Sequence, residues 1–339
     1  MNLATIGIIG GGSWGTALSL VLKNNNHDVD IWLRDNKQVE EILEIRENKR
    51  YLPGVFLPKE IGITSDIEKA IYKKDILVLA IPSHSVRQVL NEYKHLIDKS
   101  QILLNVAKGI ENDTLFRVSQ VVNSILPDNP YAVLSGPSHA EEVALNMPTT
   151  VVAASDNMEI AEYIQDVFMG PYFRVYTNPD VIGVELGGAL KNVIALGAGI
   201  SDGLGYGDNT KAALMTRGII EISRLGEKMG ANKSTFAGLT GIGDLIVTCT
   251  SMHSRNRRAG ILIGQGEKLE QVVKKVGMVV EGIKTTKSAY ELSKKYGVNM
   301  PITKEIYEVL YEGKDVKSSV FNLMLRDKKH ELEDIIREY

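Results

Sequence analysis

The feature of this sequence that most constrains its fold is a glycine-rich turn close to the N-terminus. The turn, Gly10–Gly15, has the pattern G-x-G-x-x-G, directly follows the apolar run Thr5–Ile9, and opens an amphipathic segment. In that context Gly10 permits the tight turn, Gly12 lets a pyrophosphate approach the backbone, and Gly15 lets helix and strand pack closely. The amide groups at the helix start then face the phosphates. We expect a dinucleotide-binding turn here, the alternative being a glycine-rich turn without a ligand.

The rest of the first half alternates short apolar runs with amphipathic segments, at spacings suited to βαβ units. Several runs are apolar throughout, which is typical of parallel strands covered by helices on both faces. These patterns predict an α/β domain with a Rossmann-like, doubly wound sheet. The predicted strands are Thr5–Ile9, Asp28–Leu33, Ile76–Ala80, Ile102–Val106, Ala132–Leu134, Thr150–Ala154 and Phe173–Tyr176. The predicted helices are Trp14–Asn24, Lys37–Glu47, Asp66–Lys73, Ser85–Leu96, Thr114–Ile125 and Asn157–Phe168.

The second half has a different pattern, because strand signals fade after about Asn178 and long helical patterns take over. The segment Asn178-Pro179-Asp180 breaks the chain before a helix. We therefore predict an NAD(P)-binding Rossmann-like domain over residues 1–180 and an all-helical C-terminal domain, binding the substrate, over residues 181–339. The predicted helices are Val181–Ile200, Asp208–Met229, Asp244–Thr250, Arg255–Ile263, Lys284–Lys295, Ile302–Tyr311 and a mixed-charge stretch, Arg326–Glu338.

Composition excludes several other classes of protein. The 339 residues carry 39 Lys and Arg against 42 Asp and Glu, so there is no electrostatic footprint for nucleic acid. Cys249 is the only cysteine, so neither an intramolecular disulfide nor a thiolate zinc site can form, and we expect no metal. There is no basic leader, and no apolar stretch approaches the roughly 20 residues that span a bilayer. We expect a cytoplasmic protein without a membrane segment; its oligomeric state, a homodimer included, stays open.

The end of the second predicted strand bears on the choice of cofactor. An acidic residue there pairs with the ribose hydroxyls of NAD, whereas a basic residue accepts the additional phosphate of NADP. Arg34 occupies the place of the acid, and Asp35 follows one position later. This order favours NADP or the use of either cofactor, and a solvated arginine at a strand end is the alternative.

A lysine on an unusually small helical face is the first candidate for chemistry. Lys191 lies within Val181–Ile200, with Gly187 and Gly188 one turn before it. Two adjacent glycines cost on the order of 1 kcal/mol each relative to alanine in a helix. A face kept small in this way indicates that a ligand or another backbone presses against it, and an ordinary surface lysine is the alternative.

Two further segments place charged groups at helix starts. Asp244 follows the glycine-rich run Gly238–Gly243 and shares a helix face with Thr248. Ser254 is a candidate N-cap, and Arg255 stands in the first turn, where the helix dipole disfavours a cation. An arginine in that position is expected if an anion binds there. The alternatives are a carboxylate that complements a helix dipole and a solvated basic face.

In combination these motifs resemble the NAD(P)-dependent glycerol-3-phosphate dehydrogenases of bacterial type. The resemblance covers nearly the whole chain in order, and several of its motifs are more specific than a general dinucleotide fingerprint. It rests on Gly10–Gly15, Lys108-Gly109, Ser135–Ser138, Glu185–Asn192, Gly238–Asp244, Ser254–Asn256 and Val280–Gly282.

The resemblance implies the interconversion of sn-glycerol 3-phosphate and dihydroxyacetone phosphate with NAD(P)(H), supplying glycerophospholipid synthesis. It implies that Lys191 transfers the proton. Cofactor contacts are implied for Ser13, Trp14, Arg34, Lys108, Ala140, Arg255, Val279 and Glu281, beside Gly10, Gly12 and Gly15 of the turn. Substrate contacts are implied for Lys108, Gly136, Ser138, Lys191, Asp244, Ser254, Arg255 and Asn256.

The chemistry of ketone reduction explains these residue types. A cation beside the ketone oxygen stabilises the developing alkoxide, and a positioned acid supplies its proton. We expect Lys191 to be that acid, Lys108 to lower its pKa, and Asp244 to orient it, while Arg255 and Asn256 take the substrate phosphate. Two alternatives stay open: a related β-hydroxyacid-type dehydrogenase, and a dinucleotide redox sensor without turnover. Cys249 is expected to be a core residue, and His139 is given no role in proton transfer.

Overall fold

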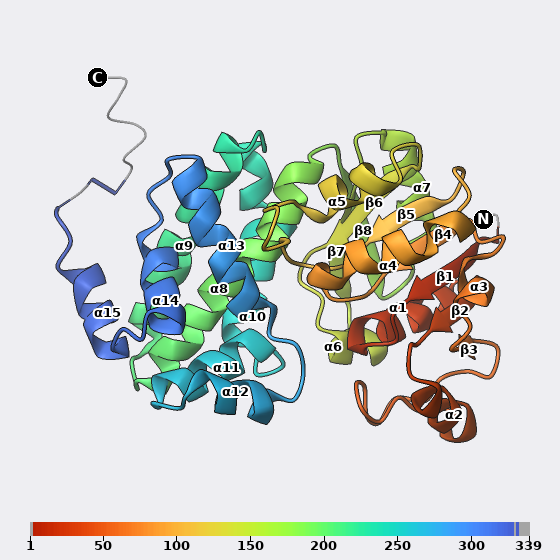
Figure 1. Cartoon of the computed structure of the whole chain (residues 1–339), viewed down its shortest axis with the longest axis horizontal. Helices are drawn as coiled ribbons and strands as arrows, with labels where there is room; N and C mark the ends of the chain where they lie inside the picture. The colour runs from red at the N-terminus through yellow and green to blue at the C-terminus, as the bar shows by residue number, and fades with distance from the viewer. Residues whose placement is uncertain (1–2, 329, 332–339) are drawn as a thin grey trace.

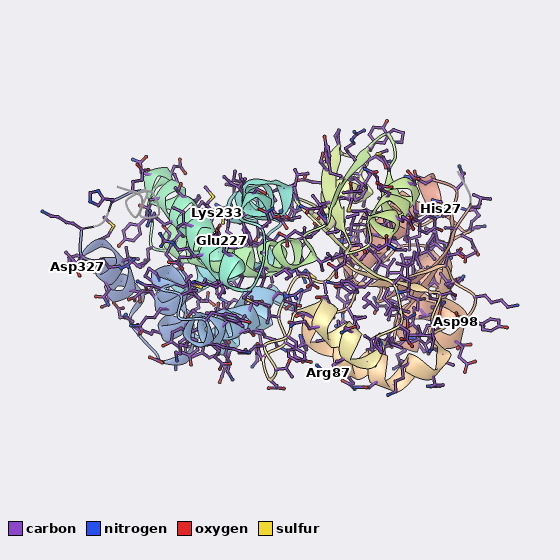
Figure 2. The ribbon with its side chains drawn as sticks, turned by 90° about the horizontal axis from the view of Figure 1, so that it is seen from above. His27, Arg87, Asp98, Glu227, Lys233 and Asp327 are labelled. Carbon is purple, nitrogen blue, oxygen red and sulfur yellow. The ribbon has the colours of Figure 1, made fainter. Side chains whose placement is uncertain are left out.

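The protein consists of a sheet half and a helical half joined by one long helix. The structure, a computed structural model, describes residues 3–328, 330 and 331. Figure 1 shows the sheet half in red to yellow and the helical half in green to blue, with α8 (Val181–Gly203) leading from one into the other. In Figure 2, turned by 90°, the labelled His27 lies in the sheet half, and Asp327 lies at the far end of the helical half.

The sheet has eight strands in the order β3-β2-β1-β4-β5-β6-β7-β8. The first six strands are parallel and have the order 3-2-1-4-5-6 of dinucleotide-binding sheets, whereas β7 is antiparallel to β6 and parallel to β8. The carboxyl ends of β1 and β4 therefore flank the point where the strand order reverses, which is where ligands of such sheets bind. The strands are β1 (Thr5–Ile9), β2 (Asp28–Trp32), β3 (Gly62–Thr64), β4 (Ile76–Leu79), β5 (Ile102–Asn105), β6 (Tyr131–Ser135), β7 (Thr149–Ala154) and β8 (Phe173–Asn178).

Helices cover both faces of this sheet, and successive residues of a strand pack alternately against the helices on one face and on the other. Ile6 and Ile8 of β1 pack in one buried cluster with α1, α2 and α7, and Ile9 packs in a second cluster with α3, α4 and α5. This alternation follows from the period of two in a strand, and it explains why the strands are apolar throughout. The helices are α1 (Ser13–Asn24), α2 (Asn36–Ile45), α3 (Ile67–Ile71), α4 (Val86–Tyr93), α5 (Val118–Ile125), α6 (Ala140–Ala144) and α7 (Met158–Phe168).

The helical half is organised around α8, which is apolar on all sides and is surrounded by the other helices. Its closest neighbour is α11, because a Cβ on Gly199 would stand 2.1 Å from the carbonyl oxygen of Arg257, and one on Gly260 would stand 2.1 Å from that of Leu196. The remaining helices are α9 (Asp208–Lys228), α10 (Asp244–Thr250), α11 (Arg255–Gly264), α12 (Leu269–Val276), α13 (Glu281–Lys295), α14 (Pro301–Tyr311) and α15 (Val316–Met324).

One sequence expectation fails on α8. By length and composition this helix of 23 residues could cross a membrane, although no apolar stretch of that size was expected. However, 89% of its most apolar window is buried inside the protein, which is the property of a core helix.

A buried carboxylate attaches α8 to the sheet half. Glu185 accepts hydrogen bonds from Arg117 Nη1 at 2.5 Å, from the amide and hydroxyl of Ser119 at 2.8 and 2.6 Å, and from the Tyr131 hydroxyl at 2.6 Å. Burial, and then the charge of Glu185, raise the pKa of Tyr131 well above its ordinary value, so the phenol stays a donor. These contacts hold α8 against α5 and β6 and so set where the following turns of α8 lie.

The predicted element types are mostly confirmed, and the differences have local causes. The expected helix over Thr114–Ile125 begins only at Val118, and the antiparallel β7 was not foreseen. Part of the expected helix Arg326–Glu338 lies outside the described residues, and Arg326–Lys328 are not helical. The sequence patterns missed β3, α6, α12 and α15, of which β3 and α6 are too short, at 3 and 5 residues, for a periodic signal.

Candidate active site

The glycine-rich turn has the geometry that the sequence predicts. Gly10 has a φ of +117°, and a Cβ there would stand 2.6 Å from the carbonyl oxygen of Ala80. A Cβ on Gly15 would stand 2.1 Å from the Gly10 carbonyl oxygen, so strand and helix do need a glycine at their contact. A Cβ on Gly12, by contrast, would meet no atom of the described residues within 4 Å. The open space beside Gly12, at the start of α1, is where a phosphate can reach the backbone amides.

The residues around this turn fit a bound dinucleotide. Trp14 is half-buried, and its indole Nε1 is shielded from solvent but has no hydrogen-bond partner among the described residues, which leaves a donor for a ligand. The Ser13 hydroxyl donates to the carbonyl of Tyr51 at 2.6 Å and so holds the loop after α2 beside the turn. Asp35 caps α2 by accepting from the Lys37 amide at 3.0 Å, whereas Arg34 is exposed at the end of β2. The Asp35 carboxylate is therefore engaged in capping α2, whereas the Arg34 guanidinium is accessible to a ligand.

The centre of the site is a carboxylate held between two lysines. Asp244, at the start of α10, is 1% exposed; its Oδ2 accepts from Lys108 Nζ at 2.8 Å, and its Oδ1 accepts from Lys191 Nζ. Lys191 Nζ also donates to the Thr248 hydroxyl at 2.7 Å. An ammonium has three N–H donors, so these two bonds leave one donor of Lys191 for a substrate.

The second lysine is attached to the loop after β6. Lys108 Nζ donates to the carbonyl of Gly136 at 2.8 Å, and a longer contact of 3.4 Å reaches the Ser138 hydroxyl. Gly136 has a φ of +137°, a conformation that favours glycine, and its backbone packs on Val151 of β7. The carboxyl ends of β5 and β6 thus meet α8 and α10 at this centre.

Burial and charge together set the protonation of the centre. Burial lowers the pKa of Lys191 to about 7, against the opposing charge of Asp244, and the charge of Lys108 lowers it further. Burial alone would raise the pKa of the Asp244 carboxyl, but the two ammonium groups hold it below its ordinary value. The site therefore contains a permanent carboxylate beside a lysine that can gain or lose its proton near neutral pH.

The small face of α8 has a different cause for each of its two glycines. A Cβ on Gly187 would stand 2.4 Å from the carbonyl oxygen of Thr240, and one on Gly188 would stand 2.6 Å from the Ser135 hydroxyl and 3.5 Å from Lys108 Cγ. Another backbone, one of the two expectations, therefore presses against Gly187, whereas the side chains of Ser135 and Lys108 press against Gly188. Thr240 belongs to a π-helical turn, Leu239–Gly243, that leads into α10 and carries Asp244 up to Lys191.

The start of α11 brings a cation to the same region. The Ser254 hydroxyl caps the helix by accepting from the Arg257 amide at 3.2 Å, as the sequence predicts. Burial lowers the pKa of the Arg255 guanidinium, while the charges of Glu281 and Glu141 oppose that effect. A guanidinium near carboxylates and close to a helix N-terminus suits an anionic ligand that displaces or bridges these groups.

Asn256 is engaged in the framework of the site. Its amide nitrogen donates to Asn192 Oδ1 at 2.9 Å, and its oxygen accepts from the Gly282 amide at 2.8 Å. Asn192 in turn donates to the Lys108 carbonyl at 3.2 Å. This chain of amides connects α8, α11 and α13 to the loop of Lys108, which is a positioning task that the sequence analysis did not assign. A polar residue directly after Lys191, on a mostly apolar helix, is the signal that could have indicated it.

The remaining expected cofactor residues lie at the starts of α6 and α13. Glu281, at the start of α13, accepts from the Ser83 amide at 3.2 Å and from its hydroxyl at 3.1 Å, across the two halves of the protein. Burial raises the pKa of the Glu281 carboxyl, against the opposing bonds from Ser83 and the charge of Arg255. Val279 is exposed just before α13, and Ala140 is buried at the start of α6. Ser83 is a contact that the sequence did not reveal.

A cavity in the helical half lies apart from this centre. A cavity of about 260 Å³ lies among α8, α9, α14 and α15, lined by Leu214, Ile306 and Leu323 among other side chains, and none of the expected site residues lines it. Charge and hydrogen bonding, rather than enclosed volume, locate the chemistry. Among the residues that the structure describes, no group of three or more His, Cys, Asp or Glu side chains is arranged to hold a metal ion.

Comparison with known proteins assigns the chain to a family. The family models for the NAD-dependent glycerol-3-phosphate dehydrogenase N-terminus and C-terminus match residues 5–161 and 180–321. The glycerol-3-phosphate dehydrogenase [NAD(P)+] of Bacillus pumilus (strain SAFR-032) is 56% identical over 98% of each chain. That of Thermoanaerobacter sp. (strain X514) is 58% identical over 97% of this chain and 99% of its own.

A solved structure shows the same architecture over nearly the full length. The crystal structure of glycerol-3-phosphate dehydrogenase from Coxiella burnetii superposes with a TM-score of 0.93 at 37% identity, covering 96% of this chain and 99% of its own. The sequence families, the relatives and the fold agree. The chain therefore belongs to the NAD-dependent glycerol-3-phosphate dehydrogenase family.

Proposed function

We propose that this protein interconverts sn-glycerol 3-phosphate and dihydroxyacetone phosphate with NAD(H) or NADP(H), using Lys191 as the proton-transferring group. The observation that carries the proposal is the buried carboxylate of Asp244, which binds Lys108 and Lys191 at once. When bound beside this centre, the nicotinamide cofactor supplies or accepts the hydride. Its pyrophosphate would lie at the turn around Gly12, where a side chain would meet nothing within 4 Å.

In the direction of ketone reduction, the remaining N–H of Lys191 donates to the ketone oxygen of the substrate. Asp244 and Thr248 hold the other two N–H groups, so the ammonium keeps one orientation. Lys108 adds a second positive charge nearby, which stabilises the negative charge that develops on the oxygen. The proton then passes from Lys191 Nζ to that oxygen, and an alcohol forms.

In the direction of alcohol oxidation, the same lysine must begin neutral. Burial brings the pKa of Lys191 to about 7, so a neutral amine is accessible at physiological pH and can take the hydroxyl proton. The permanent charge of Asp244 stabilises the ammonium that results. One residue can thus serve both directions.

The substrate phosphate is assigned to the start of α11. Arg255 supplies a guanidinium there, and Ser254 and Asn256 flank it. Ser138 and the Gly136 carbonyl lie within reach of Lys108 on the opposite loop and would border the rest of the substrate. Glu281, Val279 and Ala140 would border the cofactor, with Arg34 beside the adenosine ribose.

The two alternative functions receive no support from the relatives. Curated relatives that are 54–58% identical to the chain are named glycerol-3-phosphate dehydrogenase [NAD(P)+], not hydroxyacid dehydrogenase or sensor. A redox sensor would also have no use for a lysine pair bound to a fully buried carboxylate.

The direct test is the absorbance of the nicotinamide with purified protein and dihydroxyacetone phosphate. NADH and NADPH are supplied in parallel, and oxidation with at least one of them is expected. Arg34→Asp should raise the KM for NADPH more than that for NADH, because it removes the cation available to the additional phosphate. If wild-type protein binds both cofactors and oxidises neither, the proposed reaction is wrong.

We also propose a homodimer, a cytoplasmic location and a role in supplying glycerophospholipid synthesis. The support for a second copy is an apolar surface on α15, where Phe321, Met324 and the adjoining Leu325 are 67%, 78% and 72% exposed. Figure 1 places this helix at the outer end of the helical half. Light scattering at micromolar concentration tests the proposed homodimer, and the mass of a monomer would contradict it.

A further inference from the structure

The connection between α2 and β3 is long, and it packs against the glycine-rich turn. It covers residues 46–61, whereas such connections in α/β units usually have about two to six residues. A longer connection in a compact domain usually has a function of its own. Two contacts fasten it to the turn. The carbonyl of Tyr51 accepts from the Ser13 hydroxyl at 2.6 Å, and the side chain of Asn48 donates to the carbonyl of Gly11 at 2.9 Å.

The side-chain amide of Asn48 is buried and held in one orientation. The residue is 1% exposed. Its Nδ2 donates to the Gly11 carbonyl and to the Thr16 hydroxyl, both at 2.9 Å, and its Oδ1 accepts from Gln38 Nε2 at 3.2 Å. A carbonyl only accepts hydrogen bonds, so the contact with Gly11 requires the nitrogen of the amide on that side. Both N–H donors of Asn48 are therefore used within the protein.

The bond to Gly11 fixes the direction of the next backbone donor. The carbonyl of Gly11 and the N–H of Gly12 belong to one trans peptide unit, so they point in opposite directions. Because Asn48 holds the carbonyl, the Gly12 N–H points away from Asn48. This N–H has no acceptor among the described residues, and a Cβ on Gly12 would meet none of their atoms within 4 Å. The donor is therefore available to a ligand in the open space beside Gly12.

The glycines of the turn explain why such a restraint is needed. A peptide between two glycines has no Cβ on either side, so local sterics determine its orientation only weakly. Rotation of the Gly11–Gly12 peptide by about half a turn would replace the N–H by a carbonyl oxygen, which repels a phosphate. A stiffer residue cannot take the place of Gly11, because its Cβ would stand 2.5 Å from Leu33 Cγ. The orientation must therefore be set from outside the turn.

We propose that Asn48 is a positioning residue for the cofactor, which holds the Gly11–Gly12 peptide so that the Gly12 N–H can bind the pyrophosphate. This inference rests on the proposed function, which places the pyrophosphate beside Gly12. Asn48 acts through the backbone and does not itself contact the cofactor, because both of its N–H donors are already used. NADH and NADPH share the pyrophosphate, so Asn48 affects both cofactors equally, whereas Arg34 distinguishes between them.

The test is cofactor binding by variants at position 48, measured without turnover. Asn48→Leu has a similar size and removes both donors. We expect it to raise the Kd for NADH about tenfold in a fluorescence titration, the effect of about one hydrogen bond. ADP-ribose keeps the pyrophosphate and lacks the nicotinamide, so its Kd, from competition with NADH, should rise by the same factor. At saturating NADH, kcat and the KM for dihydroxyacetone phosphate should stay within about twofold of wild type, because only cofactor binding is weakened.

Two matched controls separate the orientation of the peptide from general packing. Thr16→Val removes the other acceptor of Asn48, and Gln38→Met removes the donor to its Oδ1, while both leave the bond to Gly11 in place. Each should lower the thermal midpoint, yet change the Kd for NADH by no more than about twofold, because the Gly11 carbonyl stays bound. Asn48→Ala removes the same donors as Asn48→Leu without adding bulk, and it should show the same loss of affinity. Thermal unfolding checks that each variant is folded.

Three results would overturn the inference while leaving the proposed function intact. An unchanged Kd for NADH in both variants at position 48 would show that the peptide keeps its orientation without Asn48. An equal rise of that Kd in Thr16→Val would show that the start of α1 needs only general packing. A lower kcat with an unchanged Kd for ADP-ribose would place the effect at the nicotinamide. Failure of the proposed function looks different, because wild-type protein would then bind NADH and oxidise none with dihydroxyacetone phosphate.

Discussion

Replacement of Asp244 by asparagine tests the electrostatic centre of the proposed mechanism. The substitution keeps the size of the side chain and removes the charge that both lysines contact, Lys108 Nζ at 2.8 Å among them. Two ammonium groups would then share a site in which Asp244 itself is only 1% exposed. Lys191 is the group that then loses its proton, since burial already lowers its pKa to about 7 and Asp244 is the main influence that opposes this effect.

The size of the effect follows from the loss of one adjacent charge. An opposite charge in contact shifts a pKa by about one to three units, so the pKa of Lys191 should fall below its value near 7 by about that amount. Reduction needs the ammonium, and oxidation needs the amine. In wild-type enzyme, kcat/KM for reduction should therefore decline as the pH rises through about 7, and kcat/KM for oxidation should increase over the same range. In Asp244→Asn both midpoints should move to lower pH.

The assay is the pH dependence of kcat/KM in both directions, which reports the pKa values of the free enzyme. Thr248→Val is the matched control, because it removes the neutral partner of Lys191 at 2.7 Å and leaves every charge in place. Its midpoint should move by at most about one pH unit, as expected for one neutral hydrogen bond. Midpoints that stay in place or rise in Asp244→Asn would refute the reasoning, because Lys191 would not then be the titrating group.

Two further predictions concern the acid and the glycine-rich turn. Lys191→Ala should lower kcat by orders of magnitude while the affinity for NADH, from fluorescence titration, changes little, and retained turnover would remove Lys191 from the mechanism. Gly15→Ala should destabilise the protein by on the order of 1–3 kcal/mol in denaturant unfolding, because its Cβ would stand 2.1 Å from the Gly10 carbonyl oxygen. Gly12→Ala should stay closer to wild-type stability but weaken NADH binding about tenfold, since its Cβ enters the open space where the pyrophosphate would bind. An equal loss of stability in Gly15→Ala and Gly12→Ala would contradict this contrast.

The sheet half could be predicted well because its signals are local. Thr5–Ile9 is β1 with the bounds that the sequence suggested, and the strand next to it in the sheet, Ile76–Leu79, differs by one residue at its end. Buried parallel strands are continuous apolar runs, so they can be recognised without their neighbours. The reversed direction of β7 could not be recognised, because an apolar run reads the same in either direction.

The candidate site could be predicted as a set of residue types but not as an arrangement. Asp244 and Thr248 share a helix face because they are four residues apart, and in the structure both accept hydrogen bonds from Lys191 Nζ. The contact of Lys108 with Asp244 joins residues that are 136 positions apart, and nothing local in the sequence indicates it. The same holds for Ser83 with Glu281, which are 198 positions apart.

The sequence by itself determined the type of each half of the chain, the glycine-rich turn and the residues capable of proton transfer, because periodicity, backbone freedom and side-chain chemistry belong to single segments. Only the tertiary structure decided that Lys108 and Lys191 both contact the carboxylate of Asp244. Gly187 and Gly188 let the π-helical turn and the loop of Lys108 approach α8, and Glu185 holds that helix to the sheet through the Tyr131 hydroxyl. The pKa of a lysine depends on burial and on charges brought from distant segments, and those are properties of the packed protein alone.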